Sequence, residues 1–133
     1  MRDILFRGLW VHGNKEWIEG DLVRDSEGKP HIVDSKYVDY WHGEPIFVCE
    51  EECEVIPETV GQYTGLMDKD GKKVFEGDIV RWDGDEISII RYCEGVYRLC
   101  NAEGYYGVSL HNHFSYVEVI GNIHDNPELL EVK

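Results

Sequence analysis

Apolar and polar positions alternate over short segments of the chain, and Gly, Asn or Asp stands at most of the reversals between segments. In the second half of the chain the segments are rich in Val, Ile and Tyr, and they cover residues 78–82, 86–92, 96–100, 105–110 and 114–123. Alternation of this kind predicts half-buried strands, and closely spaced turns between strands are typical of antiparallel hairpins. The pattern therefore predicts a mainly β protein whose C-terminal half is an SH3-like small barrel formed by a meander.

One unit of the pattern occurs twice. A shift of 57 residues aligns residues 6–9 with 63–66 and WIEGDLVR, residues 17–24, with VFEGDIVR, residues 74–81. In each copy a polar turn with Gly and Asn or Asp separates two apolar stretches, and these residues supply the positive backbone dihedrals of a tight reversal. Each copy is predicted to form a strand, a hairpin turn and a second strand.

Both copies contain the sequence Glu-Gly-Asp in the middle of an apolar run. The residues are Glu19, Gly20 and Asp21 in the first copy and Glu76, Gly77 and Asp78 in the second. Gly inside an apolar run marks a bulge, a bend or the close approach of another backbone, and Asp beside a bend accepts bonds from exposed N–H groups. We interpret these residues as structural corners. The alternative is a set of carboxylates that serves a metal ion or acid–base chemistry, which requires that they converge.

Helical signals are short. Asp125 and Asn126 precede Pro127 as a capping residue precedes the first turn of a helix, and a second short turn is expected at residues 57–59. Residues 25–56 contain further short strands without a Ser- or Pro-rich linker. We predict an N-terminal β unit with a variable insert over residues 1–56 and a C-terminal barrel over residues 57–133, with one compact domain as the alternative.

Charge restricts the partners. The 133 residues include 13 Lys and Arg against 27 Asp and Glu, a net charge of −14, while 42% hydrophobic residues are enough for a core. This field repels a phosphate backbone and argues against direct nucleic-acid binding, but it suits a basic protein surface or a DNA mimic; solubility is the commoner explanation. The candidate interaction surface combines the densest acidic stretch with nearby aromatics: Glu50, Glu51, Glu52, Glu54, Tyr40 and Trp41. Tyr37, Tyr105 and Tyr106 are further aromatic candidates.

No apolar run approaches the roughly 20 residues that span a bilayer, and charged residues interrupt the first apolar stretch. We therefore expect a cytoplasmic protein with reduced cysteines and no membrane contact.

Specific chemistry has weak support in the residue spacing. A zinc site from Cys49, Cys53, His111 and His113 is conceivable, but the paired CxxC knuckles of strong zinc motifs are absent. A nucleophilic site of Cys93 or Cys100 with His124 is weaker still, since a chain with several Cys and His always offers such pairs. No phosphate-binding glycine motif precedes a helix. We predict no metal, no cofactor and no enzymatic activity.

Three longer stretches, residues 56–66, 68–80 and 119–130, together with residues 2–8 and 17–22, resemble the YopX family of phage and prophage proteins. The resemblance covers almost the whole chain except residues 27–53. It implies an origin in bacterial phages or prophages, a mostly β fold and an intracellular life, and it implies no catalytic residue.

Three functional hypotheses remain. The first, which we favour, is a noncatalytic interaction module that binds a host or phage protein through acidic and aromatic surface, with self-association through open strand edges as an added expectation. The second is a DNA mimic or nucleic-acid-associated regulator. The third is a metal-dependent enzyme that uses the Glu-Gly-Asp carboxylates.

Overall fold

The computed structural model describes residues 4–13, 16–33, 38–42, 44–47, 53–101 and 107–130, with the backbone alone for 38–41 and 44–47. The chain is mainly β, its named strand pairs are antiparallel, and the helical structure in these ranges consists of short 3-10 turns. The mainly β antiparallel prediction is confirmed. The chain divides into two compact units, Met1–Gln62 and Tyr63–Lys133, and the division falls in strand β6 (Gly61–Met67).

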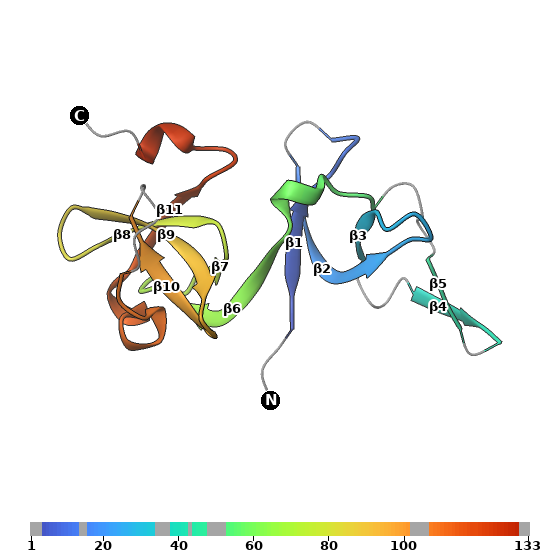
Figure 1. The fold of residues 1–133 in the computed structure, drawn as a ribbon, viewed down its shortest axis with the longest axis horizontal. Coiled ribbons are helices and arrows are strands. Elements are labelled where there is room, and N and C mark those ends of the chain that lie inside the picture. The colour runs from blue at the N-terminus through green and yellow to red at the C-terminus, as the bar shows by residue number, and fades with distance from the viewer. Residues whose placement is uncertain are drawn as a thin grey trace. The chain divides into compact units, whose positions relative to one another are not determined.

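The first unit is organised by one long strand. Its elements are β1 (Phe6–Leu9), β2 (Trp17–Arg24), β3 (Pro30–Val33), β4 (Val38–Trp41), β5 (Glu44–Phe47) and the 3-10 turn η2 (Pro57–Thr59). The first half of β2 pairs with β1 and its second half pairs with β3, while β4 and β5 form a separate hairpin (Figure 1). Gly61 and Gln62, at the start of β6, pair with the other side of β1. β3, β2, β1 and the start of β6 therefore lie next to one another in this order.

The core of the first unit lies under β1 and β3. Every residue of β3 is buried, and Leu9, Cys53 and Val55 are buried with it. Gly8 permits this packing because a Cβ at that position would lie 2.8 Å from the Cβ of Val55. The predicted turn at residues 57–59 is confirmed as η2, and the Oγ1 of Thr59 accepts the N–H of Leu9 at 2.9 Å.

The second unit contains a four-stranded sheet, the hairpin of β6 with β7 and, within the described residues, three 3-10 turns. Its elements after β6 are β7 (Lys73–Phe75), β8 (Asp78–Trp82), β9 (Glu86–Cys93), β10 (Val96–Cys100), η3 (Leu110–Asn112), η4 (Phe114–Tyr116), β11 (Glu118–Asn122) and η5 (Pro127–Leu130). The sheet has the order β10-β9-β8-β11, and β7 pairs with β6 (Figure 1). Closure into an SH3-like barrel stays a prediction.

An apolar cluster of buried side chains lies in the second unit. Its fully buried members are Val74, Val80, Ile90, Leu99, Leu110 and Val117, and Leu66, Trp82, Tyr97, Phe114 and Val119 pack around them. Complete burial of an aliphatic side chain of this size contributes about 1.5–3 kcal/mol. Because the members come from β7 to β10 and from both sides of η4, the turns are fixed by the same core as the strands.

The strands at residues 78–82, 86–92 and 96–100 are confirmed, and so is the turn after Asn126, which is η5. The predicted strand at 114–123 is wrong in its first part, where η4 precedes a strand that begins at Glu118, and the predicted strand at 105–110 ends instead in η3. The reason is packing: the turns bring Leu110 and Val117, both fully buried, into one core. Residues 102–106 lie outside the described ranges.

Candidate functional site: an aromatic hollow in the second unit

The turn after β8 has an unusual backbone. Trp82 pairs with Glu86 across the hairpin, and between them Asp83 and Gly84 have φ values of 47° and 81°. Asp is among the few residues other than Gly that tolerate this left-handed region, because its short polar side chain bonds locally. Asp83, the residue that follows Trp82, therefore adopts a left-handed backbone at the start of this turn.

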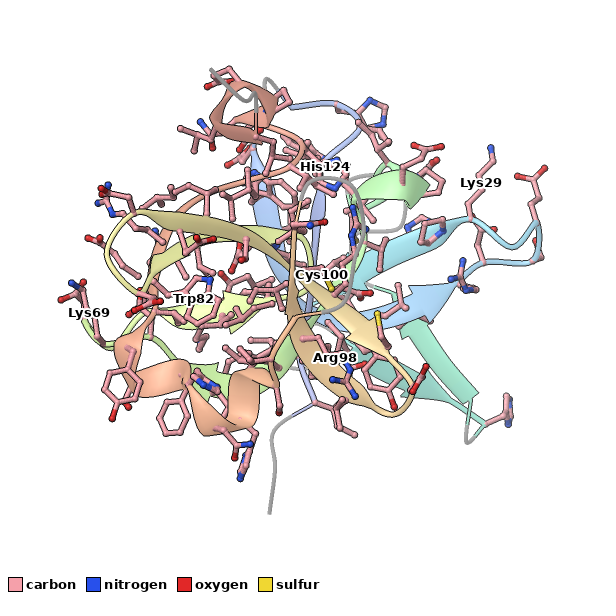
Figure 2. All side chains as sticks on the ribbon, turned by 60° about the vertical axis from the view of Figure 1, so that its left-hand side comes forward. Lys29, Lys69, Trp82, Arg98, Cys100 and His124 are labelled. Atoms are coloured by element: carbon pink, nitrogen blue, oxygen red, sulfur yellow. The ribbon has the colours of Figure 1, made fainter. Side chains whose placement is uncertain are left out.

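Trp82 is held in a fixed orientation. Its Nε1–H donates to the Oγ of Ser88 at 2.8 Å, and Ser88 is buried on the neighbouring strand β9. The ring packs on the apolar cluster and remains half-buried. Figure 2 labels Trp82 within the second unit, among the strands of that unit. The indole is thus a rigid wall whose only N–H group is already bonded.

His113 and Tyr116 come from the chain between η3 and the end of η4. The Nδ1 of His113 lies 2.9 Å from the carbonyl oxygen of Ser109, which can only accept, so this nitrogen carries a proton. In the neutral ring Nε2 is then an acceptor. The imidazole meets Trp82 edge-on, with ring centroids 5.8 Å apart. Residues three apart eclipse each other in 3-10 geometry, which accounts for the position of Tyr116 on the same side as His113.

Together these residues form an open hollow of about 460 Å³ that is lined by Trp82, Asp83, His113 and Tyr116. This volume falls in the range of sites that bind small molecules or side chains, roughly 300–1,000 Å³. Tyr116 is 69% exposed. The arrangement offers ring surfaces and one carboxylate, a composition suited to binding.

The second Glu-Gly-Asp corner is tightly bonded. Gly77 has a φ of 91°, its N–H donates to the carbonyl of Ile90, and its carbonyl accepts the N–H of Ile123. Asp78 is 2% exposed, and its Oδ2 accepts the N–H of Phe75 at 2.7 Å. This carboxylate is engaged in the turn between β7 and β8.

The first corner has a different local structure. The backbone continues as strand β2 through Glu19, Gly20 and Asp21, and both acidic residues are exposed. The first copy therefore contains no turn for Asp21 to brace. The two corners belong to different units.

A second repeated motif was not recognised in the sequence. Asp25-Ser26-Glu27-Gly28-Lys29 and Asp68-Lys69-Asp70-Gly71-Lys72 share the pattern Asp-x-acid-Gly-Lys. In both, Oδ1 of the first Asp accepts the N–H groups two and four residues later at 2.9–3.0 Å, and the Gly has a positive φ. The repeated motif is a turn held by a carboxylate.

The second carboxylate oxygen, Oδ2, has a different partner in each of the two turns. Oδ2 of Asp25 lies 2.9 Å from Nε2 of His31, and this hydrogen bond is the main cause that lowers the pKa of Asp25. Oδ2 of Asp68 accepts the N–H of Val119. Both groups act as structural braces within their own units.

Most of the predicted interaction surface lies outside the described residues. Glu50, Glu51, Glu52, Tyr37, Tyr105 and Tyr106 are in that group, and of Tyr40 and Trp41 only the backbone in β4 is described. Glu54 is half-buried and forms an isolated bridge with His31, so its backbone serves the first unit.

The four residues considered for a zinc site are divided between the two units. Cys49 lies outside the described residues, Cys53 is buried in the first unit, and His111 and His113 belong to the second. Within the described part of the chain, no group of three or more His, Cys, Asp or Glu side chains could hold a metal ion.

The two cysteines that were considered as nucleophiles do not have the surroundings of an activated thiol. Cys100 is fully buried, and burial raises the pKa of the Cys93 thiol. Nucleophilic cysteines need the opposite shift, toward the thiolate. His124 lies in the turn after β11, where its backbone N–H donates to Oδ1 of Asn122.

A model of the YopX protein family matches residues 5–131. The chain belongs to the YopX family. Among solved structures it resembles the crystal structure of protein EF1440 from Enterococcus faecalis, with a TM-score of 0.56, 23% identity, and coverage of 98% of this chain and 100% of that chain. At this identity the likeness shows a shared fold. No curated protein matches the chain.

The hollow of this YopX chain was missed in the sequence because its residues come from segments about thirty positions apart. The available signal was the pair of ring-bearing residues at 113 and 116, spaced by three in a stretch interpreted as strand. In the described ranges no helix is long and apolar enough to cross a membrane.

Proposed function

We propose that this YopX protein is a noncatalytic interaction module of a phage or prophage, and that it binds a protein of the phage or of the bacterial host. The observation that carries the proposal is the hollow of the second unit, where Trp82, His113 and Tyr116 present ring surface at the protein surface. Aromatic residues are enriched in protein–protein interfaces and at their energetic centres, because each buries a large area at low conformational cost.

A binding role has more support than a catalytic one. Among the described residues that line the hollow, the phenol of Tyr116 is the only hydroxyl and there is no thiol. Outside the hollow, the carboxylates of Asp68 and Asp78 are buried and accept backbone N–H groups, which makes them braces of turns. The predicted acidic surface at Glu50 to Glu54 remains part of the proposal as a second contact.

The test is affinity capture of the tagged chain from phage-infected and uninfected bacterial lysate. We expect one stoichiometric partner that the Tyr116→Ala variant loses. The matched control is Tyr92→Ala, because Tyr92 is also exposed, at 55%, but lies on β9 against Tyr97 and does not line the hollow.

Two outcomes would contradict the proposal: no enriched partner in either lysate, or equal capture by the Tyr116→Ala and wild-type chains. A third variant, with Glu50, Glu51 and Glu52 changed to Gln, tests the acidic contact. Loss of the partner in that variant would support the acidic contact, and unchanged capture would remove it from the proposal.

A further inference from the structure

We propose that the hollow of Trp82, Asp83, His113 and Tyr116 binds an arginine side chain of a basic segment in the partner protein. The inference rests on the proposed interaction function and specifies the chemistry of its partner. It is derived from the hydrogen-bonding inventory, the ring surfaces and the charges of the hollow.

The described residues that line the hollow offer mainly hydrogen-bond acceptors. The indole N–H of Trp82 is donated to Ser88, and the Nδ1–H of His113 is donated to the Ser109 carbonyl. What remains is the Asp83 carboxylate, the Nε2 atom of His113, which accepts in the tautomer that carries its proton on Nδ1, and the hydroxyl of Tyr116, which both donates and accepts. A ligand that only donates hydrogen bonds fits this set, and guanidinium has five donors and no acceptor.

The ring surfaces favour the same ligand. Trp is the best aromatic partner of a cation, and a planar guanidinium stacks on an indole in a way that an ammonium group does not. The first unit already contains this contact, since the guanidinium carbon of Arg7 lies 4.7 Å from the ring centroid of Trp17. Asp83 also lines the hollow, and a carboxylate is the group that binds the guanidinium fork through paired hydrogen bonds.

The local charge points in the same direction. Asp83 and Asp85 are exposed in the turn between β8 and β9, and Glu86 is exposed at the start of β9. The nearest cation along β8, Arg81, is paired with Glu118 at 2.8 Å. The net charge of −14 adds a long-range field that attracts a basic segment.

The experiment titrates the full chain with acetyl-glycyl-arginyl-glycine amide and follows the indole N–H resonance of Trp82, assigned with a Trp82→Phe variant. The probes for comparison are the citrulline peptide, which keeps the planar shape without the charge, and the lysine peptide. We expect saturable shifts with arginine, at least about fivefold weaker binding of lysine, and no saturation with citrulline, since charge-assisted bonds and cation–π contact are both lost.

The matched pair of variants is Asp83→Asn and Asp85→Asn. Both remove one charge from the same turn, and Asn tolerates the left-handed backbone of position 83, but only Asp83 lines the hollow. We expect Asp83→Asn to weaken arginine binding about tenfold, because it removes a carboxylate that lines the hollow, and Asp85→Asn to change it less than about twofold. If Asp83 acted only through the general electrostatic field, the two variants would have similar effects.

The arginine proposal is overturned if Trp82 does not respond to the arginine peptide, if citrulline or lysine binds equally well, or if the two Asn variants weaken binding equally. If the peptide titration fails but affinity capture finds a partner that the Tyr116→Ala variant no longer binds, the interaction function stands and the hollow binds another ligand. Arginine binding without any captured partner would keep the chemistry of the hollow and contradict the interaction function.

Discussion

Replacement of Asp68 by Asn tests how strongly the second unit depends on one buried carboxylate. Asp68 is 6% exposed, and its two oxygens accept three backbone N–H groups at 2.9 Å. Oδ1 accepts from Asp70 and Lys72 in the turn after β6, while Oδ2 accepts from Val119 in β11, 51 residues away in sequence. The carboxylate therefore ties a local turn to the edge strand of the sheet.

The magnitude follows from the groups that Asn provides. An amide has one oxygen, so if that oxygen keeps the two donors of the turn, its NH₂ group faces the N–H of Val119. Loss of a hydrogen bond to a charged acceptor costs about 1.5–3 kcal/mol. We expect the free energy of unfolding of the second unit to fall by about 2–3 kcal/mol in Asp68→Asn.

The pH dependence has a definite sign. Burial of Asp68 raises its pKa, but the three backbone N–H donors, from Val119, Lys72 and Asp70, outweigh burial and lower the pKa below its ordinary value of 3.8. Since the folded pKa is below the unfolded one, the stabilisation is complete above the unfolded value and is lost as pH falls through the folded value. The difference in stability between wild type and Asp68→Asn should therefore shrink below about pH 4.

The assay is native-state hydrogen exchange, with the slow amides of β8 and β9 reporting on the second unit and those of β3 on the first. The control is Asp25→Asn in the equivalent turn, because Oδ2 of Asp25 faces His31, a side chain that can exchange donor for acceptor by changing tautomer. Equal losses in the two variants would refute the reasoning. So would an unchanged stability of β8 and β9, or a difference from wild type that is as large at pH 3 as at pH 7.

Three further predictions follow from single contacts. Gly77→Ala should destabilise the second unit by about 1–2 kcal/mol in urea unfolding, because φ at Gly77 is 91°. Gly20→Ala in the unbroken strand β2 is the control and should cost less stability; equal costs would contradict the reasoning. The alkylation rate of Cys93, followed by mass spectrometry, should have a pH midpoint above 9.0, since burial raises its pKa; a midpoint below 8 would show that the thiol is activated instead. Ser88→Ala should cost about 1–3 kcal/mol and shift the Trp82 indole resonance, because it leaves Nε1 without its acceptor; an unchanged resonance would mean that the bond to Ser88 does not form in solution.

The sheet of the second unit was predictable because its signals are local. The apolar runs of β8 and β9 supply Val80 and Ile90 to the core, and three consecutive residues are buried in each strand. The reversal after β9 contains Gly95 with a φ of 87°, and a glycine between two apolar segments was sufficient to place this turn. No distant contact had to be known.

The turns η3 and η4, and with them the hollow, depend on contacts that the sequence does not display. Leu110 and Val117 are fully buried in a core supplied by β7 to β10, and satisfying both requires the chain to coil instead of continuing as a strand. Propensity is a weak guide where tertiary packing decides. The site was therefore outside the reach of local pattern, although each of its residues was visible.

The repeated stretches show how the same sequence takes two local structures. In both copies the first half pairs with the preceding strand and the second half with the following one: β2 pairs with β1 and then β3, while β7 pairs with β6 and β8 pairs with β9. In the first copy, pairing is continuous across the corner, from Gly20 opposite Phe6 to Asp21 opposite Val33. In the second, Gly77 bonds instead to Ile90 and Ile123, and the strand breaks.

The repeat therefore encodes a plan of strand pairing, and long-range bonds decide whether its corner bends. The two copies diverge directly after their shared final arginine. Arg24 is followed by Asp25, whose carboxylate closes a turn, whereas Arg81 is followed by Trp82 and the left-handed Asp83, which line the hollow. A repeated scaffold that serves only folding has no need of this difference. The divergence lies where the proposed binding site begins, which is the reason to look for function beside the second copy and not in the Glu-Gly-Asp residues that the copies share.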